Sequence, residues 1–201
     1  MTKKSIQNLE WAKLMAHLQA RACVISRLTG MSASDSRKLW HAEIGRSSPS
    51  GQQPNDADWF LKSGIRRTHS AMILQLYAIS EKVLPAYAGF THAYYHYARM
   101  TAGLVERESW TTDPAFRRSE DDYVIPFARA HFLAQIYTDD QLADGKRKCT
   151  LQVRRCKACG TLYLGHVEET EKKCPACVKY AWLNFFASTS GGYFVAAGST
   201  E

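Results

Sequence analysis

Residues 154–179, RRCKACGTLYLGHVEETEKKCPACVK, decide the fold of the C-terminal part of this 201-residue chain. They hold two Cys-x-x-Cys pairs, Cys156 with Cys159 and Cys174 with Cys177, with fourteen residues between the pairs. Two residues between paired thiols allow a tight turn that directs both sulfurs to one point, and two such turns complete a tetrahedron. Gly160 follows the first pair and can adopt a positive φ there. The spacing therefore predicts one structural zinc ion bound by four cysteines.

Other uses of these thiols remain open at this stage. Four cysteines also suit an iron–sulfur cluster, whereas a redox Cys-x-x-Cys normally stands alone in a βαβ setting. A site with four thiolates has no open coordination position, so the metal is expected to stabilise a small module and to catalyse nothing. Cys23 and Cys149 are expected to be buried thiols outside the site.

The chain around this module reads as mainly α. Apolar residues of 5–28 recur at helical spacing, Gly30 suits a C-cap, and Ser32 or Ser34 suits the N-cap of a second helix over about 35–44. A Gly/Ser/Pro-rich loop follows. Further helices are expected from Asp56 or Asp58 to about Pro85, over 86–108, and from Pro126 onward. The first of them is expected to run through Trp59, Ile65, Met72, Leu76, Ile79 and Val83.

The sequence pattern changes after Gly145 to short segments in which apolar and polar residues alternate. Of these, TLQVR and TLYLG suit two short strands. We expect a helical N-terminal and central body followed by a small zinc-ribbon-like module with a short β-hairpin. The helical domain is predicted over 1–145, with a helix-turn-helix-like pair at about 5–45 and a helical middle at about 56–142. The zinc-binding module and an aromatic C-terminal tail are predicted over 146–201.

Charge and hydropathy narrow the class of protein. Lys and Arg number 26 against 19 Asp and Glu, a net charge of +7 that favours a polyanionic partner. Four thiolates and one zinc ion would lower it to about +5. No segment reaches the roughly 18 consecutive apolar residues that span a bilayer, and the N-terminus lacks the apolar core of a secretory signal. We therefore expect a cytoplasmic protein without membrane contact, whose cysteines form no disulfides.

Two sets of cations are candidate DNA contacts. In CVISRLTGMSASDSRKLWHAEIG, residues 23–45, the pattern resembles a helix-turn-helix in which Arg37, Lys38 and His41 face outward. Ser36 departs from that pattern, since an aliphatic residue is usual there, and an ordinary helical hairpin is the alternative. The second set flanks the first cysteine pair and contains no acidic residue: Lys146, Arg147, Lys148, Arg154 and Arg155. Its alternative is a solvated face of the hairpin.

Catalytic patterns are weak. His92 and His96 have the spacing of a helical metal pair, but position 93 is alanine and no third ligand is apparent. Aromatic packing on a helix is the simpler explanation. A helical enzyme using His92, His96 or His69 beside a structural zinc remains one alternative, and a non-catalytic zinc-ribbon adaptor for RNA or protein is another. The prediction is that the chain is no enzyme.

The order of several segments resembles a known family. A short N-terminal helix pair, GRSSP, DADWF, RTHSAMILQLY, a long helical middle and CKACG…CPAC together resemble the flagellar transcriptional activators of the FlhC family over about 5–177. The resemblance implies a DNA-binding subunit that works with FlhD in a heterohexamer, activates flagellar (class II) operon promoters and recruits RNA polymerase. The family's zinc-binding cysteines match Cys156, Cys159, Cys174 and Cys177. After Cys177 the aromatic, nearly uncharged tail departs from the basic tail expected of the family.

Overall fold

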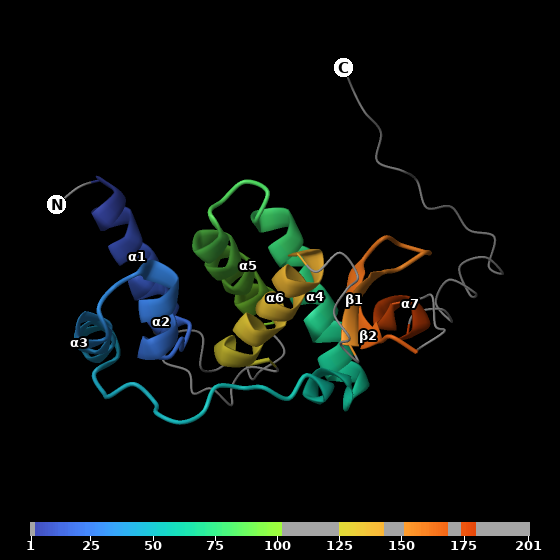
Figure 1. Cartoon of the computed structure of the whole chain (residues 1–201), viewed down its shortest axis with the longest axis horizontal. Helices are drawn as coiled ribbons and strands as arrows, with labels where there is room; N and C mark the ends of the chain where they lie inside the picture. The colour runs from blue at the N-terminus through green and yellow to red at the C-terminus, as the bar shows by residue number, and fades with distance from the viewer. Residues whose placement is uncertain (1–2, 102–124, 143–150, 169–173, 180–201) are drawn as a thin grey trace, which may run out of the picture.

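The computed structural model describes residues 3–101, 125–142, 151–168 and 174–179. Three helices, α1 (Lys3–His17), α2 (Ala22–Thr29) and α3 (Ala33–Ile44), lie at one end of the molecule, as Figure 1 shows. The middle consists of α4 (Gly64–Ser80), α5 (Ala86–Thr101) and α6 (Phe127–Leu142). At the other end lie β1 (Leu151–Arg155), β2 (Leu162–His166) and α7 (Pro175–Lys179). The mainly α fold with a C-terminal hairpin is confirmed, while the division into two domains stays a prediction.

The single helix expected over 5–28 is wrong, because the chain breaks between α1 and α2. Gln19 takes the left-handed conformation with φ 65°. The N–H of Ala20 donates to the carbonyl of Met15 at 2.9 Å, a six-residue closure that ends a helix. Glycine usually marks this position, so a glutamine gave no signal in the sequence. The break lets α2 and α3 pack back onto α1.

The turn between α2 and α3 is built as the sequence predicts. Gly30 has φ 73°, and its N–H donates to the Ser26 carbonyl at 3.0 Å. Ser32 is the N-cap of α3, where its Oγ accepts from the Asp35 N–H at 3.0 Å. Trp40 of α3 is fully buried, and its Nε1 donates to the Ala20 carbonyl at 2.8 Å. This side chain ties the second helix of the pair to the break after α1.

The central helix α4 begins later than expected. A short 3₁₀ helix, η1 (Asp58–Leu61), comes first, and Ser63 then caps α4 by accepting from the Arg66 N–H at 3.2 Å. The buried face of α4 contains Ile73, Leu74 and Tyr77. The expected extent of the helix is wrong at both ends, because Trp59 lies in η1 and Val83 lies beyond the end of α4. Ile65 and Ile79 of α4 are 60% and 55% exposed.

Trp59, in the DADWF segment, joins η1 to two helices. The guanidinium groups of Arg66 on α4 and Arg129 on α6 lie over its ring, each 4.1 Å from the ring centroid. Such cation–π contacts gain strength when they are shielded from water. The next residue, Phe60, is fully buried and stacks on Phe132 of α6 at 6.4 Å between ring centroids. The segment therefore fixes the start of α4 against α6.

The hairpin packs on the helical body. β1 and β2 pair antiparallel, with Val153 opposite Leu164. Leu151, Leu162 and Leu164 are buried in the same apolar cluster as the helices. Two bonds join strands to helices: the Val153 N–H donates to Asp140 Oδ2 of α6 at 3.1 Å, and the Leu162 N–H donates to Gln75 Oε1 of α4 at 3.3 Å. The body therefore fixes the hairpin in position before any metal is considered.

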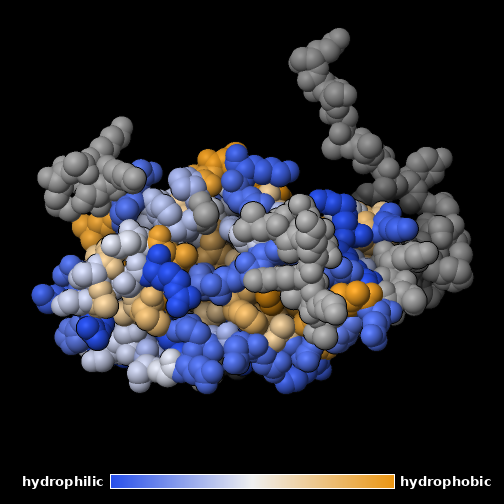
Figure 2. All heavy atoms as spheres, in the orientation of Figure 1, coloured by the Kyte–Doolittle hydropathy of each residue, from blue (hydrophilic) through white to orange (hydrophobic). Residues whose placement is uncertain are grey.

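Hydrophilic residues cover much of the face drawn in Figure 2, with small hydrophobic patches between them. In the described ranges, no helix combines the length and the apolar character that crossing a bilayer requires. The structure also corrects one expectation about thiols, because Cys23 is exposed. Cys149 lies outside the described residues.

Candidate metal centre and nucleic-acid contacts

The first cysteine pair lies in a tight turn directly after β1. The Gly160 N–H donates to the Cys156 carbonyl at 2.9 Å, and the Cys156 N–H donates to the Thr161 carbonyl at 2.9 Å. Gly160 has φ 75°, a conformation that an L side chain rarely adopts. The two bonds close the turn between β1 and β2, so Cys156 and Cys159 project from the same end of the hairpin.

The second pair lies at the start of α7. Cys174 immediately precedes the helix, and Cys177 lies in its first turn. The Cys174 N–H donates to Cys156 Sγ at 3.2 Å, and the Cys177 N–H donates to Cys174 Sγ at 3.4 Å. Backbone N–H groups stabilise thiolates, because they donate to the developing negative charge. The helix start thus supplies donors as well as sulfurs.

The four sulfurs meet at one point. All four Sγ atoms lie within 4.8 Å of one another, and the separations across the pairs are 3.9 Å for Cys156–Cys177 and 3.5 Å for Cys159–Cys174. Zinc–sulfur bonds of about 2.3 Å in a tetrahedron separate the sulfurs by about 3.8 Å. The spacing is too wide for a disulfide bond of about 2.05 Å. The donor set and its spacing fit one tetrahedral metal ion.

Because the four thiols lie close together, their pKa values shift in opposite directions. Burial raises the pKa of Cys156, but N–H donors from Cys174, Cys159 and Ala158 outweigh it and lower the pKa to about 6. A hydrogen bond with Cys159, followed by burial, raises the pKa of Cys177 to about 12. One thiolate therefore forms readily, whereas its neighbours resist a second negative charge. A divalent cation removes that resistance, because a coordinating thiol is deprotonated outright.

Helix α4 packs against the four-cysteine site. Ala71 of α4, Tyr163 of β2, Cys156 and Cys174 form a small buried cluster, with Cys177 packed against it. A small side chain at position 71 lets the cysteine turn approach the helix. The sequence pattern did not identify Ala71, Gln75 or Thr161 as partners of this module. Of the three, only Thr161 lies next to a cysteine pair in the sequence. A hydrogen bond of 3.2 Å joins its Oγ1 to Cys159 Sγ.

The cations predicted on α3 lie on its open side. Arg37, Lys38 and His41 are all exposed, whereas Trp40 is buried between them. Ile25 is fully buried, and Met31 and Leu39 pack partly buried against the same core. Ser36 is also fully buried, and its Oγ has no hydrogen-bond partner among the described residues. The helix pair therefore has the core expected of a helix-turn-helix, with a serine where an aliphatic side chain is usual.

The second set of cations is only partly described. Lys146, Arg147 and Lys148 lie outside the described residues. Arg154 and Arg155 lie at the end of β1 and both donate to carbonyls of the hairpin, Arg154 to Val167 at 2.7 Å and Arg155 to Gly160 at 2.9 Å. The Arg155 bond holds its guanidinium at the cysteine turn, whereas the Arg154 bond directs its guanidinium to the end of the hairpin away from that turn. Figure 1 shows that the hairpin and α3 lie at opposite ends of the molecule.

The three histidines considered for an enzyme, His69, His92 and His96, do not form one cluster. His69 is buried, and its Nδ1 makes a 3.0 Å hydrogen bond with the Tyr97 hydroxyl. His92 and His96 contact each other on α5, with their Nε2 atoms 3.1 Å apart. Of the three, only this pair brings imidazole nitrogens together.

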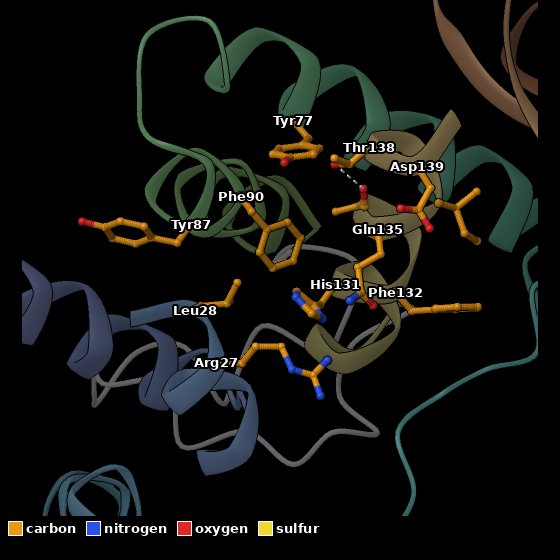
Figure 3. Close-up of a pocket in the computed structure, with 12 residues that line it drawn as sticks. Arg27, Leu28, Tyr77, Tyr87, Phe90, His131, Phe132, Gln135, Thr138 and Asp139 are labelled. Carbon is orange, nitrogen blue, oxygen red and sulfur yellow. Dashed lines mark hydrogen bonds between the residues drawn. The ribbon is translucent and has the colours of Figure 1, made fainter. Parts of the chain in front are cut away.

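A cleft of about 430 Å³ lies between α2 and the central helices, and none of those three histidines lines it. In Figure 3, Arg27 and Leu28 of α2 lie opposite Phe90 of α5 and His131 of α6. Burial, followed by the charge of Arg27, lowers the pKa of His131 to about 4, so this imidazole is neutral at pH 7. Its ring packs edge-on against Phe90 at 5.5 Å. Sequence reasoning did not identify this histidine, because only the tertiary fold brings α2 against it.

Comparison with known families gives one match. A model described as "Flagellar transcriptional activator (FlhC)" matches residues 1–181. A search among curated proteins finds no match.

Proposed function

Because the chain belongs to the FlhC family of flagellar transcriptional activators, we propose that it is a DNA-binding activator subunit that works with FlhD. In this proposal the two proteins form a heterohexamer on flagellar (class II) promoters in the cytoplasm and recruit RNA polymerase. The family consists of transcriptional regulators, not enzymes. The match over 1–181, which includes both cation sets and all four cysteines, is the observation that carries the proposal.

The helix pair α2–α3 supports a direct DNA contact. A recognition helix needs a buried face that fixes it to the body and an open face that reaches the groove. Trp40 supplies the first through its burial and its bond to Ala20, and Arg37, Lys38 and His41 supply the second. We assign these three residues to the DNA interface, together with Lys146, Arg147, Lys148, Arg154 and Arg155.

We propose zinc as the ion of the cysteine site, with Cys156, Cys159, Cys174 and Cys177 as its ligands. Thiolate sulfur suits zinc, and the spacing of the sulfurs fits a tetrahedron. The ion would supply folding free energy to the turn between the strands and to the short helix α7. Arg155, whose guanidinium donates to the Gly160 carbonyl, lies beside this turn.

Assembly with FlhD would explain how a chain with a modest positive charge binds DNA tightly. With zinc bound the chain carries about +5, starting from a formal +7. Arg154 and Arg155 on β1 lie at the opposite end of the molecule from the cations of α3, so few of the described cations face any one stretch of duplex. Linking several subunits raises the effective concentration of each contact, and each neutralised phosphate adds to the salt dependence. We therefore expect strong binding only in the complex with FlhD.

The test is co-purification of the chain with FlhD, followed by footprinting and affinity measurements on flagellar promoter DNA at several salt concentrations. We expect weak binding by the chain alone, much tighter binding by the complex, and a steep loss of affinity with salt. Equal affinity with and without FlhD would contradict the assembly. Binding to RNA or to protein instead of duplex DNA would favour the zinc-ribbon adaptor.

A further inference from the structure

Two imidazoles on α5 converge outside the cysteine site. His92 and His96 are one helical turn apart, and their rings meet at 4.4 Å between centroids with an interplanar angle of 68°. The two Nε2 atoms are 3.1 Å apart. His96 is exposed and His92 is half-buried, so the edge that carries both nitrogens is open to water.

The inner ring is held from the other side. His92 Nδ1 lies 3.1 Å from Oγ of Ser80, a residue of α4 that is only 5% exposed. When Nδ1–H donates to this hydroxyl, the lone pair of the ring remains on Nε2, on the side of His96. The close approach of the helices depends on Gly89, where a Cβ would lie 3.2 Å from Glu81 Cα. The fold thus fixes the orientation of His92, and the Nδ1–H tautomer leaves Nε2 able to coordinate.

We propose that His92 and His96 form a second metal site, which binds a first-row transition ion such as zinc through their Nε2 atoms. Bonds of about 2.0–2.1 Å at angles of 90–110° separate two nitrogens on one metal by about 2.9–3.4 Å. The observed 3.1 Å lies inside this range. Ser80 is then the outer partner that orients a metal-binding histidine.

The ligand set distinguishes this site from the cysteine centre. Imidazole nitrogen suits zinc, nickel and copper, whereas four thiolates close a site completely. Two protein ligands leave coordination positions for water or for a group from another molecule. The site therefore exchanges its ion more readily than the cysteine centre does.

The experiment uses the untagged full-length chain, in complex with FlhD if the chain alone does not stay in solution. The protein is first loaded with zinc and dialysed until the metal content is constant, and zinc is then titrated calorimetrically. We expect one further equivalent to bind. His92→Gln and His96→Gln should each remove this equivalent, while His41→Gln, which changes a single exposed histidine on α3, should retain it. Circular dichroism checks that each variant is folded, and the exposure of His96 makes His96→Gln the safer of the two.

Ser80→Ala separates a positioned site from an accidental pair. Loss of the outer partner typically weakens metal binding by about 10–100-fold, so the second equivalent should bind at least about tenfold more weakly. A second equivalent that survives in both histidine variants, or none in the unaltered protein at 0.1 mM free zinc, about a hundred times the Kd of a micromolar site, would overturn the proposal. Promoter binding is measured separately, so failure here leaves the activator function untouched.

Discussion

The two ends of the molecule are stabilised by different interactions. The N-terminal helices bury large apolar side chains completely, among them Met15, Leu18, Ile25 and Trp40. Among the described residues, the cysteine turn and α7 share a small buried cluster of Ala71, Tyr163 and two cysteines. Apolar burial contributes roughly 25 cal/mol per Å², so the first end has a large hydrophobic term and the second a small one.

This difference indicates that metal binding by the cysteines stabilises the end of the molecule that has the smaller hydrophobic core. The hairpin packs its leucines on α4 and α6. Among the described residues, the cysteine turn and α7 bury few apolar side chains, and four sulfurs converge there instead. Removing metal and removing an apolar anchor should therefore affect opposite ends of the same molecule.

The largest effect is expected from Cys156→Ser. Structural zinc sites supply about 10–16 kcal/mol of apparent binding free energy in small modules, and a three-thiol site forfeits much of it. The variant should lose zinc, and the cysteine turn and α7 should become sensitive to protease while the helical signal in circular dichroism survives. Zinc content and limited proteolysis check this. Cys23→Ser, at an exposed cysteine outside the cluster, should keep its zinc. Full zinc content in Cys156→Ser would rule out the ligand set.

Trp40→Ala should destabilise the N-terminal helices α1–α3. Truncating a fully buried tryptophan costs about 3–5 kcal/mol, and here the Ala20 carbonyl also loses its 2.8 Å hydrogen bond. We expect faster hydrogen exchange of the α1–α3 amides, with one zinc per chain retained. Trp40→Phe, which keeps the apolar ring but loses the donor, should cost less, about 1–3 kcal/mol. Loss of zinc in Trp40→Ala would show that the two ends are not separately stabilised.

Local chemistry explains what the sequence predicted well. Two Cys-x-x-Cys pairs carry their ligand geometry in their spacing, and the sulfurs do meet. Gly30 and Ser32 act as caps through their own backbone and side chain, so residue type alone was informative. The alternating segments after Gly145 predicted β1 and β2 within a residue or two.

Tertiary contacts explain what the sequence missed. The break at Gln19 uses a residue with no particular preference for positive φ, and the surrounding packing imposes it. The buried face of α4 could not be placed from the sequence, because α5, α6 and β2 cover the helix, bury polar Ser70 and Ser80, and leave Ile79 exposed. Gln75 and Ser80 gain their roles only through the strand or helix that packs against them.

The cations at the two ends can be compared in DNA binding. Arg37→Ala on α3 and Arg154→Ala on β1 should each weaken promoter binding by the FlhD complex by less than about tenfold, or 1.4 kcal/mol, and reduce the salt slope by about 1. Because these sites lie far apart in Figure 1, the double variant should show additive losses. Lys62→Ala, at an exposed lysine paired with Asp56, is the control. Unchanged affinity and salt slope in both variants would place the interface elsewhere.

The smallest effect separates the two candidate caps of α3. Ser32→Ala removes the acceptor for the Asp35 N–H and should destabilise the N-terminal helices by about 1 kcal/mol. Ser34→Ala changes an exposed serine inside the first turn, where alanine favours the helix, so stability should hold or rise slightly. Urea unfolding of both variants, with zinc content measured in parallel, makes the comparison. Equal destabilisation by both substitutions would mean that the hydroxyl of Ser32 does not start the helix, and that packing of Trp40 alone sets its position.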